Sequence, residues 1–511
     1  MTDTRLNLFI GSLIGSGGYG RIFVVLAIGL IAVISGLFVG IEWYVFVAAE
    51  LAPLLVVMSM LFVARNRYPS RLLFCLSIAA LVSSAVWPRY AYIRVGGLPG
   101  ITPTRVVILL SILALVVLFV RSIVFRRELL DRFGRASRLL SCVFVFELLR
   151  MLSAAFSDQW IPSLIGFANE FVSISVVLIL CVAGIGDRNE LRDVLKFIYL
   201  SVFLVVLVGF IEFFAQKSLF ADFLDVNDDY VRDVLLAKVR DSAYRVQSTF
   251  DHPLSYAQFI ACLLPMVVCS FVAFQGKLKK FMLFVLFSGL LASIFATGSR
   301  SGAIVGVSGV LLTLVLLAIV NVIRGGFGRG VPYLVTIFIG IAVLLLVFVA
   351  YGDRFIDFAV GRSAAEYSST SARLLMFERA LPLIMDSPIV GHGVNRAAEL
   401  IGFVGARGVV TVDSLLLSFA VESGVFALLA YVSMIALGVW KALRNSINDA
   451  SETSSLQVGF AGALIAFFFT SMTLSLSGNL FLVGFLLASV TCCKPLEDNV
   501  HSNRNSKLAE F

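Results

Sequence analysis

Long apolar runs alternate with short polar segments along most of the chain. A helix needs about 20 apolar residues to cross the hydrocarbon core of a bilayer, and the pattern predicts about fourteen such helices. They are expected near residues 22–40, 42–64, 71–87, 106–125, 139–156, 163–184, 195–215, 254–274, 281–297, 303–323, 331–351, 414–440, 455–472 and 477–493. The run 414–440 is longer than one crossing requires, so its beginning could lie outside the hydrocarbon.

The composition indicates the same class of protein. The 511 residues are 59% hydrophobic and only 14% charged, and the mean hydropathy is +0.99. This balance excludes a soluble globular domain. We predict an all-α fold, a polytopic transmembrane helical bundle of about 12–14 spans with a large extracytoplasmic loop region.

The positions of Lys and Arg predict the orientation. With both termini inside, the inside segments hold about 23 basic residues and the outside segments about 15, as the positive-inside rule requires. No cleavage pattern follows the N-terminal segment, so the first helix is expected to be an uncleaved insertion signal. The net charge of +8 then reflects cytoplasmic anchors and indicates no nucleic-acid partner.

Two polar segments are too long to be simple connections, and both fall outside in this topology. Loops of such length are usually functional. The expected organisation is N-terminal transmembrane helices over 1–215, an external loop over 216–253, transmembrane helices over 254–351, a large external loop over 352–413, C-terminal transmembrane helices over 414–493 and a cytoplasmic tail over 494–511.

The first external loop contains an acidic cluster that begins at Asp222, followed by Val231, Val234, Leu235 and Val239 at helical spacing. This spacing predicts an amphipathic helix that either lies along the membrane face or packs on other helices. The acidic cluster lacks the spacing of a metal site. The cysteines lie in or at the ends of apolar runs, so no disulfide framework, Cys/His metal cluster or cofactor is expected.

Three arginines in the predicted external segments are the strongest candidates for chemistry. Arg300 lies in the very short hinge TGSRSG (297–302), Arg245 opens RVQSTFDHP (245–253), and Arg373 lies in the second long loop. A guanidinium group pairs with two phosphate oxygens at once, which suits an anionic ligand. Arginines at a membrane surface are also common anchors, and this alternative stays open for each of them.

The second loop ends in two further polar features. DSPIVGHG (386–393) predicts a turn fixed by Pro388 and two glycines, in which His392 is a turn residue and not a catalyst. Asp413 and Ser414 precede the next helix, which contains Glu422. Asp413 could accept a proton from a hydroxyl group or could be the N-cap of that helix. Glu422 is the second candidate for a general base.

In this order, these segments resemble the O-antigen ligase/polymerase superfamily, which includes O-antigen ligases and Wzy-type polymerases. The likeness rests on RVQSTFDHP (245–253) with Ser248 in the place of a family glycine, the hinge 299–302, the loop 371–393, and the helix opening at Asp413 with ESG (422–424). It covers about residues 200–440; the earlier helices match only in kind.

The resemblance implies a GT-C-like membrane glycosyltransferase of the bacterial inner membrane. Such an enzyme takes glycan from an undecaprenyl-diphosphate carrier on the outer face of that membrane. Arg245 and Arg300 would hold the diphosphate and Arg373 would add a loop contact. Asp413, or failing it Glu422, would be the catalytic base, and no metal would be needed. Partners would be the lipid-linked glycan, membrane lipid and a chain-length regulator protein.

One difference from the family pattern distinguishes polymerase activity from ligase activity. Ligases of the superfamily open the helix after the large loop with His, whereas this chain has Asp413 there. This favours a polymerase of lipid-linked repeat units over a ligase that transfers glycan to lipid A-core or protein.

A transporter of lipid-linked sugars is the alternative from another class, because transporters carry polar residues at the bilayer midplane. Glu50, Glu147, Arg150, Glu170 and Glu212 are the candidate intramembrane charges. Glu147 and Arg150 are spaced to neutralise each other on one helix face.

Overall fold

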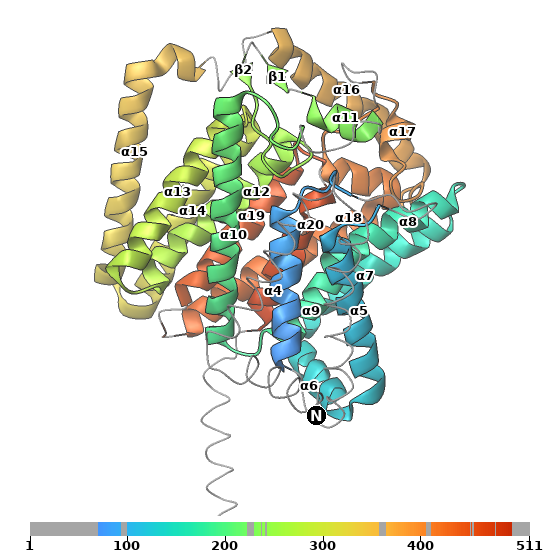
Figure 1. Cartoon of the computed structure of the whole chain (residues 1–511), viewed down its shortest axis with the longest axis horizontal. Helices are drawn as coiled ribbons and strands as arrows, with labels where there is room; N and C mark the ends of the chain where they lie inside the picture. The colour runs from blue at the N-terminus through green and yellow to red at the C-terminus, as the bar shows by residue number, and fades with distance from the viewer. Residues whose placement is uncertain are drawn as a thin grey trace, which may run out of the picture. The chain divides into compact units, whose positions relative to one another are not determined.

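The computed structural model describes residues 70–92, 100–221, 229–236, 238–240, 243–356, 364–404, 410–449, 451, 454–475 and 477–492. Almost all regular structure in these ranges is helical (Figure 1). The predicted spans near 22–40 and 42–64, most of the acidic cluster after Asp222 and the tail from Lys494 lie outside the described residues.

The helices follow the apolar runs. In chain order they are α4 (Ser70–Val86), α5 (Pro103–Arg121), α6 (Ile123–Gly134), α7 (Ser137–Ala155), α8 (Trp160–Phe171), η2 (Val172–Val176), α9 (Val177–Gly184), α10 (Arg188–Ala215), α11 (Asp229–Leu235), α12 (Pro253–Ala273), α13 (Lys277–Ala296), α14 (Arg300–Gly325), α15 (Phe327–Ile356), α16 (Ala364–Asp386), α17 (Ala397–Ile401), α18 (Leu415–Asn448), α19 (Ser454–Ser471), η4 (Ser477–Asn479) and α20 (Leu480–Thr491). A two-stranded antiparallel hairpin joins β1 (Val239–Arg240) to β2 (Ala243–Tyr244).

Within the described part of the chain, eight helices are long and apolar enough to cross a membrane. They are Pro103–Arg121, Trp160–Gly184, Arg188–Ala215, Pro253–Ala273, Lys277–Ala296, Arg300–Gly325, Leu415–Asn448 and Ser454–Ser471. The prediction of an all-α, polytopic membrane protein is confirmed. The span Trp160–Gly184 contains a turn of π-helix, η2, a local widening of the kind often found at functional sites.

The chain divides into two compact units. The first comprises Met1–Asp131, Ile179–Ala237 and Ser248–Asp251, and in it α4 packs on α5 and α10. The second comprises Arg132–Leu178, Lys238–Gln247 and His252–Phe511, and its centre is formed by α12 and α19, which pack on each other and on α14. In both α12 and α19, 83% of the most apolar window is buried, so these two helices are the core of the second unit.

Small residues allow the core helices of the second unit to approach closely. A Cβ atom at Gly302 would lie 2.7 Å from the Ala257 Cβ of α12, and one at Gly462 of α19 would lie 2.1 Å from the Thr313 Oγ1 of α14. Membrane helices lack a hydrophobic force between them, so close van der Waals contact at small residues is a main source of their association.

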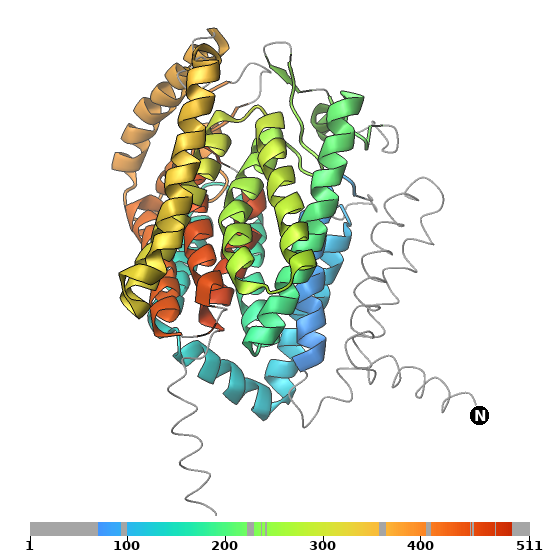
Figure 2. The same ribbon diagram turned by 90° about the vertical axis from the view of Figure 1, so that its left-hand side faces the viewer.

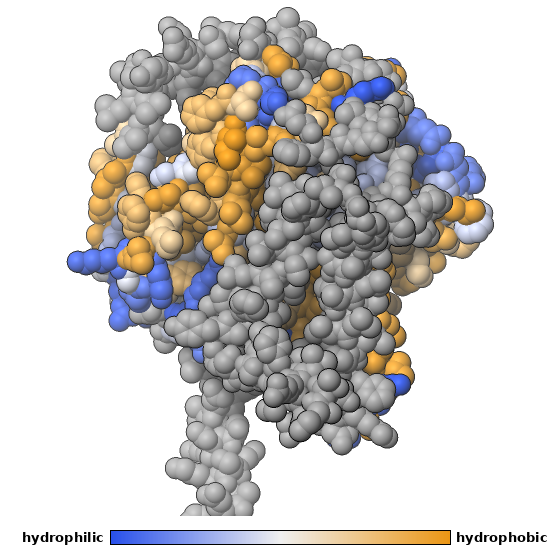
Figure 3. Space-filling model, viewed as in Figure 1, coloured by the Kyte–Doolittle hydropathy of each residue, from blue (hydrophilic) through white to orange (hydrophobic). Residues whose placement is uncertain are grey.

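The two ends of the second unit differ in character. Figures 1 and 2 both place the β1–β2 hairpin and α16 at one end of it. The α14–α15 turn lies at the opposite end, with Arg324 and Arg329 beside it, as does the start of α13 at Lys277. Figure 3 shows orange apolar residues along α13 and α14 and blue hydrophilic residues near their lower end. The basic turns predicted to be inside thus lie opposite the segments predicted to be outside.

The amphipathic helix predicted in the first external loop is shorter than expected. α11 has seven residues, and Val239 belongs to a strand instead. Val231, Val234 and Leu235 are buried in a cluster with Tyr90, against which Phe220 packs. The apolar face of α11 is therefore covered by the protein itself, so the packing alternative is correct and the membrane-surface alternative is not.

The long apolar run at 414–440 forms a helix that is broken at Gly424, where φ is +78° and ψ is 175°. The loop 387–394 supplies the backbone bonds that the break removes. The N–H groups of His392 and Gly393 donate to the carbonyls of Val421 and Glu422 at 3.1 and 2.9 Å, and the Val425 N–H donates to the Pro388 carbonyl at 2.8 Å. Two motifs of the sequence are therefore one structural unit, which we call the kink–loop unit (387–394 with 421–425).

We expect Gly424→Ala to destabilise the protein. The new Cβ would lie 2.5 Å from the Pro388 carbonyl oxygen, and the left-handed backbone costs a further ~1–2 kcal/mol for alanine. Gly326→Ala is the matched control, because Gly326 has a φ of +80° and nothing within 4 Å of its added Cβ. Thermal unfolding in detergent should show a clearly larger loss for Gly424→Ala; equal melting temperatures would contradict the close approach.

Candidate active site

Arg245 lies against the hinge that carries Arg300. The Arg245 Nε donates to the Thr297 carbonyl at 2.8 Å, and the next residue, Val246, donates its N–H to the Ala296 carbonyl at 3.1 Å. The Arg245 guanidinium thus meets the C-terminal carbonyls of α13, where a positive charge is favoured. Two of the three predicted arginines therefore come together at residues 297–300.

The backbone of this hinge is well fixed. Gly298 has a φ of +61°, and an added Cβ there would lie 3.2 Å from the Arg245 Nε. Ser299 caps α14 by accepting the Gly302 N–H at 3.2 Å, so Arg300 is the first helical residue. Both arginines are half-buried. Cations at the start of a helix, where free N–H groups also point outward, are suited to an anionic ligand.

The RVQSTFDHP motif (245–253) supplies the hydrogen-bond partner of one of the candidate intramembrane charges, Glu212. Ser248 has a φ of +53°, a left-handed conformation that favours glycine, which agrees with the glycine expected at this place in the family pattern. Its N–H donates to the Glu212 carboxylate at 2.6 Å and its hydroxyl donates to the Val205 carbonyl at 2.6 Å. Glu212 therefore holds the turn of the RVQSTFDHP motif within the first unit.

Arg373 and Asp413 face each other at a second place, with 3.8 Å between the Arg373 Nε and the Asp413 Oδ2. Both side chains line a pocket of about 340 Å³ between α16 and α18. Apart from this ion pair and Ser414 the lining is apolar: Met376, Phe377, Ile384, Leu416, Leu417, Ala420, Leu428 and Met472. We call it the α16–α18 pocket.

Asp413 does not cap α18. The N-cap is Ser414, whose hydroxyl accepts the Leu417 N–H at 3.3 Å, so the N-cap interpretation of Asp413 is wrong. Burial raises the pKa of the Asp413 carboxyl above its usual range, and the nearby Arg373 guanidinium counteracts part of that rise. A carboxylate that is partly desolvated and not used in capping has the chemistry of a proton acceptor.

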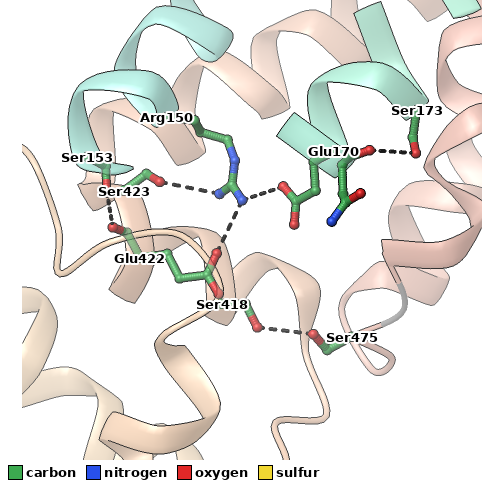
Figure 4. A network of polar contacts seen from close by, with 9 residues as sticks. Arg150, Ser153, Glu170, Ser173, Ser418, Glu422, Ser423 and Ser475 are labelled. Carbon is green, nitrogen blue, oxygen red and sulfur yellow. Dashed lines mark hydrogen bonds and ion pairs between the residues drawn. The ribbon is translucent and has the colours of Figure 1, made fainter. Parts of the chain in front are cut away.

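Glu422 lies elsewhere, in a buried cluster around Arg150 (Figure 4). The Arg150 guanidinium pairs with Glu422 at 3.2 Å and with Glu170, and it also donates to the Ser423 hydroxyl at 3.3 Å. It lies over the Phe419 ring, 4.4 Å from its centroid. Arg150 is fully buried. Glu422 is thus engaged in an ion cluster and is separate from the α16–α18 pocket.

Glu147 and Arg150 form no direct salt bridge, although their opposite charges interact over a longer distance. Glu147 instead accepts the Ser175 hydroxyl at 2.6 Å, and the cation of α7 meets carboxylates on two other helices. Spacing along one helix predicted a local pair, but a permanent charge inside a membrane takes whichever partner the tertiary packing brings. Glu170 in this role was not predicted; its only sequence signal is that it is a charge within an apolar run.

One face of α7 and its C-terminal extension holds the kink–loop unit. The Ser153 hydroxyl donates to the Glu422 carbonyl at 2.5 Å, and the Ser157 hydroxyl donates to the His392 carbonyl at 3.1 Å. With Arg150 these residues recur at helical spacing. The His392 ring bonds the Leu383 carbonyl at 2.9 Å, which fits the predicted turn role of this histidine.

Two comparisons with known proteins bear on the chain. Residues 282–432 match the family model described as O-Antigen ligase; this segment contains Arg300, Arg373, Asp413 and Glu422. No curated protein matches the chain. The match confirms the predicted resemblance to the O-antigen ligase/polymerase superfamily, whose members are glycosyl-transferring enzymes. Arg245 and α7 lie outside the matched segment.

We expect Arg150→Met to be far more destabilising than Glu422→Gln. Removing the cation leaves two buried carboxylates without a counter-charge, and breaking a buried ion pair costs about 3–5 kcal/mol, whereas Glu422→Gln leaves the pair with Glu170 intact. Lys196→Met is the control, because Lys196 and Asp193 form an exposed pair of the kind that contributes about 0–1 kcal/mol. Thermal unfolding of the purified variants measures the order; a Glu422→Gln variant as unstable as Arg150→Met would contradict it.

Proposed function

We propose that this protein is a membrane glycosyltransferase that polymerises polyprenyl-diphosphate-linked oligosaccharide repeat units into O-antigen, capsule or exopolysaccharide. The premise is the match of residues 282–432 to the O-antigen ligase family. The observation that carries the proposal is Asp413, which stands beside Arg373 at the α16–α18 pocket at the position where ligases of the superfamily have His.

In the proposed reaction, Arg245 and Arg300 bind the diphosphate of the donor. A hydroxyl oxygen of the acceptor glycan attacks the anomeric carbon of the donor, and the bond from that carbon to the diphosphate oxygen breaks. Negative charge grows on the leaving diphosphate, so fixed guanidinium groups stabilise the transition state more than the ground state. The contact of Arg245 with the 297–300 hinge supports a shared role for the two arginines.

Asp413 takes the proton of the attacking hydroxyl in this proposal. Its burial favours the neutral form and so makes the carboxylate a better base, while the Arg373 guanidinium counteracts part of the rise in its pKa. Glu422, our second candidate from the sequence, is replaced in this role: its carboxylate is held by Arg150, and we assign it to the support of the kink–loop unit.

Ligase activity toward lipid A-core or protein is the alternative. A ligase would have a His where this chain has Asp413. Of the three histidines, His252 accepts the Leu254 N–H at the start of α12 at 3.1 Å, His392 bonds Leu383, and His501 lies outside the described residues.

Transport has less support, since Arg150, Glu147 and Glu212 are each engaged in a structural contact. The inner-membrane location, cytoplasmic termini and a chain-length regulator partner stay predictions.

We expect Arg245→Ala and Arg300→Ala to abolish polymer while the protein remains in the membrane, because each removes a cation that neutralises the leaving group. Arg329→Ala at the opposite end of the second unit is the control and should leave chain lengths normal. Gel analysis of polysaccharide in a complemented deletion strain measures the effect. Single repeat units on the carrier in the deletion strain indicate a polymerase; normal chain lengths in both arginine variants would refute the proposal.

We expect Asp413→Asn to lower turnover by about 10²–10⁴-fold, the usual contribution of a general base, while Glu399→Gln, an exposed carboxylate of the same loop, has little effect. With the base present, activity falls as the pH drops through the pKa of Asp413. Arg373→Gln removes the charge that lowers this pKa, so the acidic limb should move to higher pH.

An in vitro assay with a lipid-linked donor over a pH series measures both effects. Near-normal turnover in Asp413→Asn would exclude Asp413 as the base. Elongated lipid-linked product would exclude a pure ligase.

A further inference from the structure

α16 has one side that the protein covers. Met376 and Ala380 are buried in a core cluster with Ala397 and Ile401 of α17 and Val421 of α18, and Ala372 and Leu383 pack against it. This contact attaches α16 to α18. It occupies only part of the apolar surface of the helix.

A second apolar stripe of α16 is open. Leu374, Phe377, Leu381 and Met385 recur at helical spacing, and their exposed fractions are 61%, 54%, 44% and 73%. Such a spacing aligns them along one face. Arg379 and Asp386 lie on a different face of the helix, whereas the exposed Glu378, one turn from both Leu374 and Leu381, borders the stripe. α16 therefore has a covered face, an open apolar stripe with one acidic residue at its edge, and a polar face.

The stripe lies beside a membrane span at Phe377. Phe377 lines the α16–α18 pocket together with Leu428 of α18 and Met472, which directly follows α19. Met472 is itself 43% exposed. α18 is long and apolar enough to cross a membrane, and Phe426 and Leu429, on either side of Leu428, are exposed, so this part of the stripe lies beside the apolar surface of that span.

The loop that follows the stripe is bonded close to the start of a second span. The loop after Met385 reaches His392, whose carbonyl accepts the Ser157 hydroxyl at 3.1 Å. Phe156 and Trp160 flank Ser157 and are 76% and 54% exposed, and Trp160 opens the span Trp160–Gly184. Exposed Trp at the start of a membrane helix is typical of the headgroup level of a bilayer.

We infer that α16 is an interfacial helix whose stripe (374, 377, 381 and 385) inserts into the lipid leaflet at this end of the second unit. A lipid surface fits better than a protein partner because Phe377 of the stripe lies beside the membrane span α18, and because the loop after Met385 is bonded near the exposed Trp160 at the start of another span. The adjacent polar face then stays at headgroup level. In the context of the proposed function, this contact holds the mouth of the α16–α18 pocket at the depth where a lipid-linked diphosphate lies.

Spin-label accessibility of the full chain in liposomes of phosphatidylethanolamine and phosphatidylglycerol tests this inference. A nitroxide is attached at Leu381→Cys, Met385→Cys or Asp386→Cys, each in a background with the native cysteines replaced by alanine. Met385 and Asp386 are neighbours in sequence, are both exposed and lie on different faces, so they form a matched pair. Unchanged thermal unfolding of each labelled protein establishes that it is folded.

We expect positions 381 and 385 to collide with oxygen several-fold more than with an aqueous nickel chelate, at a depth of about 5–10 Å below the headgroups, and position 386 to show the reverse. Nickel access at 381 and 385 equal to that at 386 would overturn the inference in favour of a water-facing stripe. Shielding from both reagents would overturn it in favour of a protein partner. Neither result depends on transferase activity, so the proposed function would fail or stand independently.

Discussion

The break in α18 at Gly424 is the constraint on which the candidate site depends. Backbone groups left unpaired inside a membrane protein cost several kcal/mol each, so a helix can break there only where other groups replace its lost bonds. The loop 387–394 does this with three backbone bonds to residues 421–425. The break therefore ties the end of the large loop to α18 and fixes the short helical segment 415–423, which begins beside Asp413 and lines the pocket.

Arg150 secures the same unit from the other side. Its guanidinium reaches Glu422, Ser423 and Glu170, and Ser153 and Ser157 of the same stretch bond the carbonyls of Glu422 and His392. A buried ion cluster adds little net stability compared with apolar residues of the same volume, but removing one charged partner from the cluster is costly. The cluster therefore engages the Glu422 carboxylate, whereas Asp413 lies in the lining of the α16–α18 pocket.

The three candidate arginines of the second unit lie at two places. At the 297–300 hinge, Arg245 is bound to the end of α13 beside Arg300, so the positive charge is fixed before any ligand arrives. At the pocket, Arg373 faces Asp413 at the longer distance of 3.8 Å in mostly apolar surroundings. Fixed cations suit the stabilisation of a leaving group, whereas a longer ion pair suits the adjustment of the pKa of a general base.

The sequence by itself determined the all-α membrane class, the positions of the described membrane spans and the family resemblance. A bilayer requires each span to be long and apolar and to pair its own backbone hydrogen bonds, and both requirements can be read from a sequence. It also placed the hinge of Arg300 and the turn role of His392. It failed where partners come from distant segments: Arg150 meets Glu170 and Glu422, not Glu147, and Ser414, not Asp413, caps α18. Those choices belong to the tertiary structure, because a desolvated charge pairs with whichever carboxylate the packing of helices brings within reach, and spacing along one helix contains no information about its neighbours.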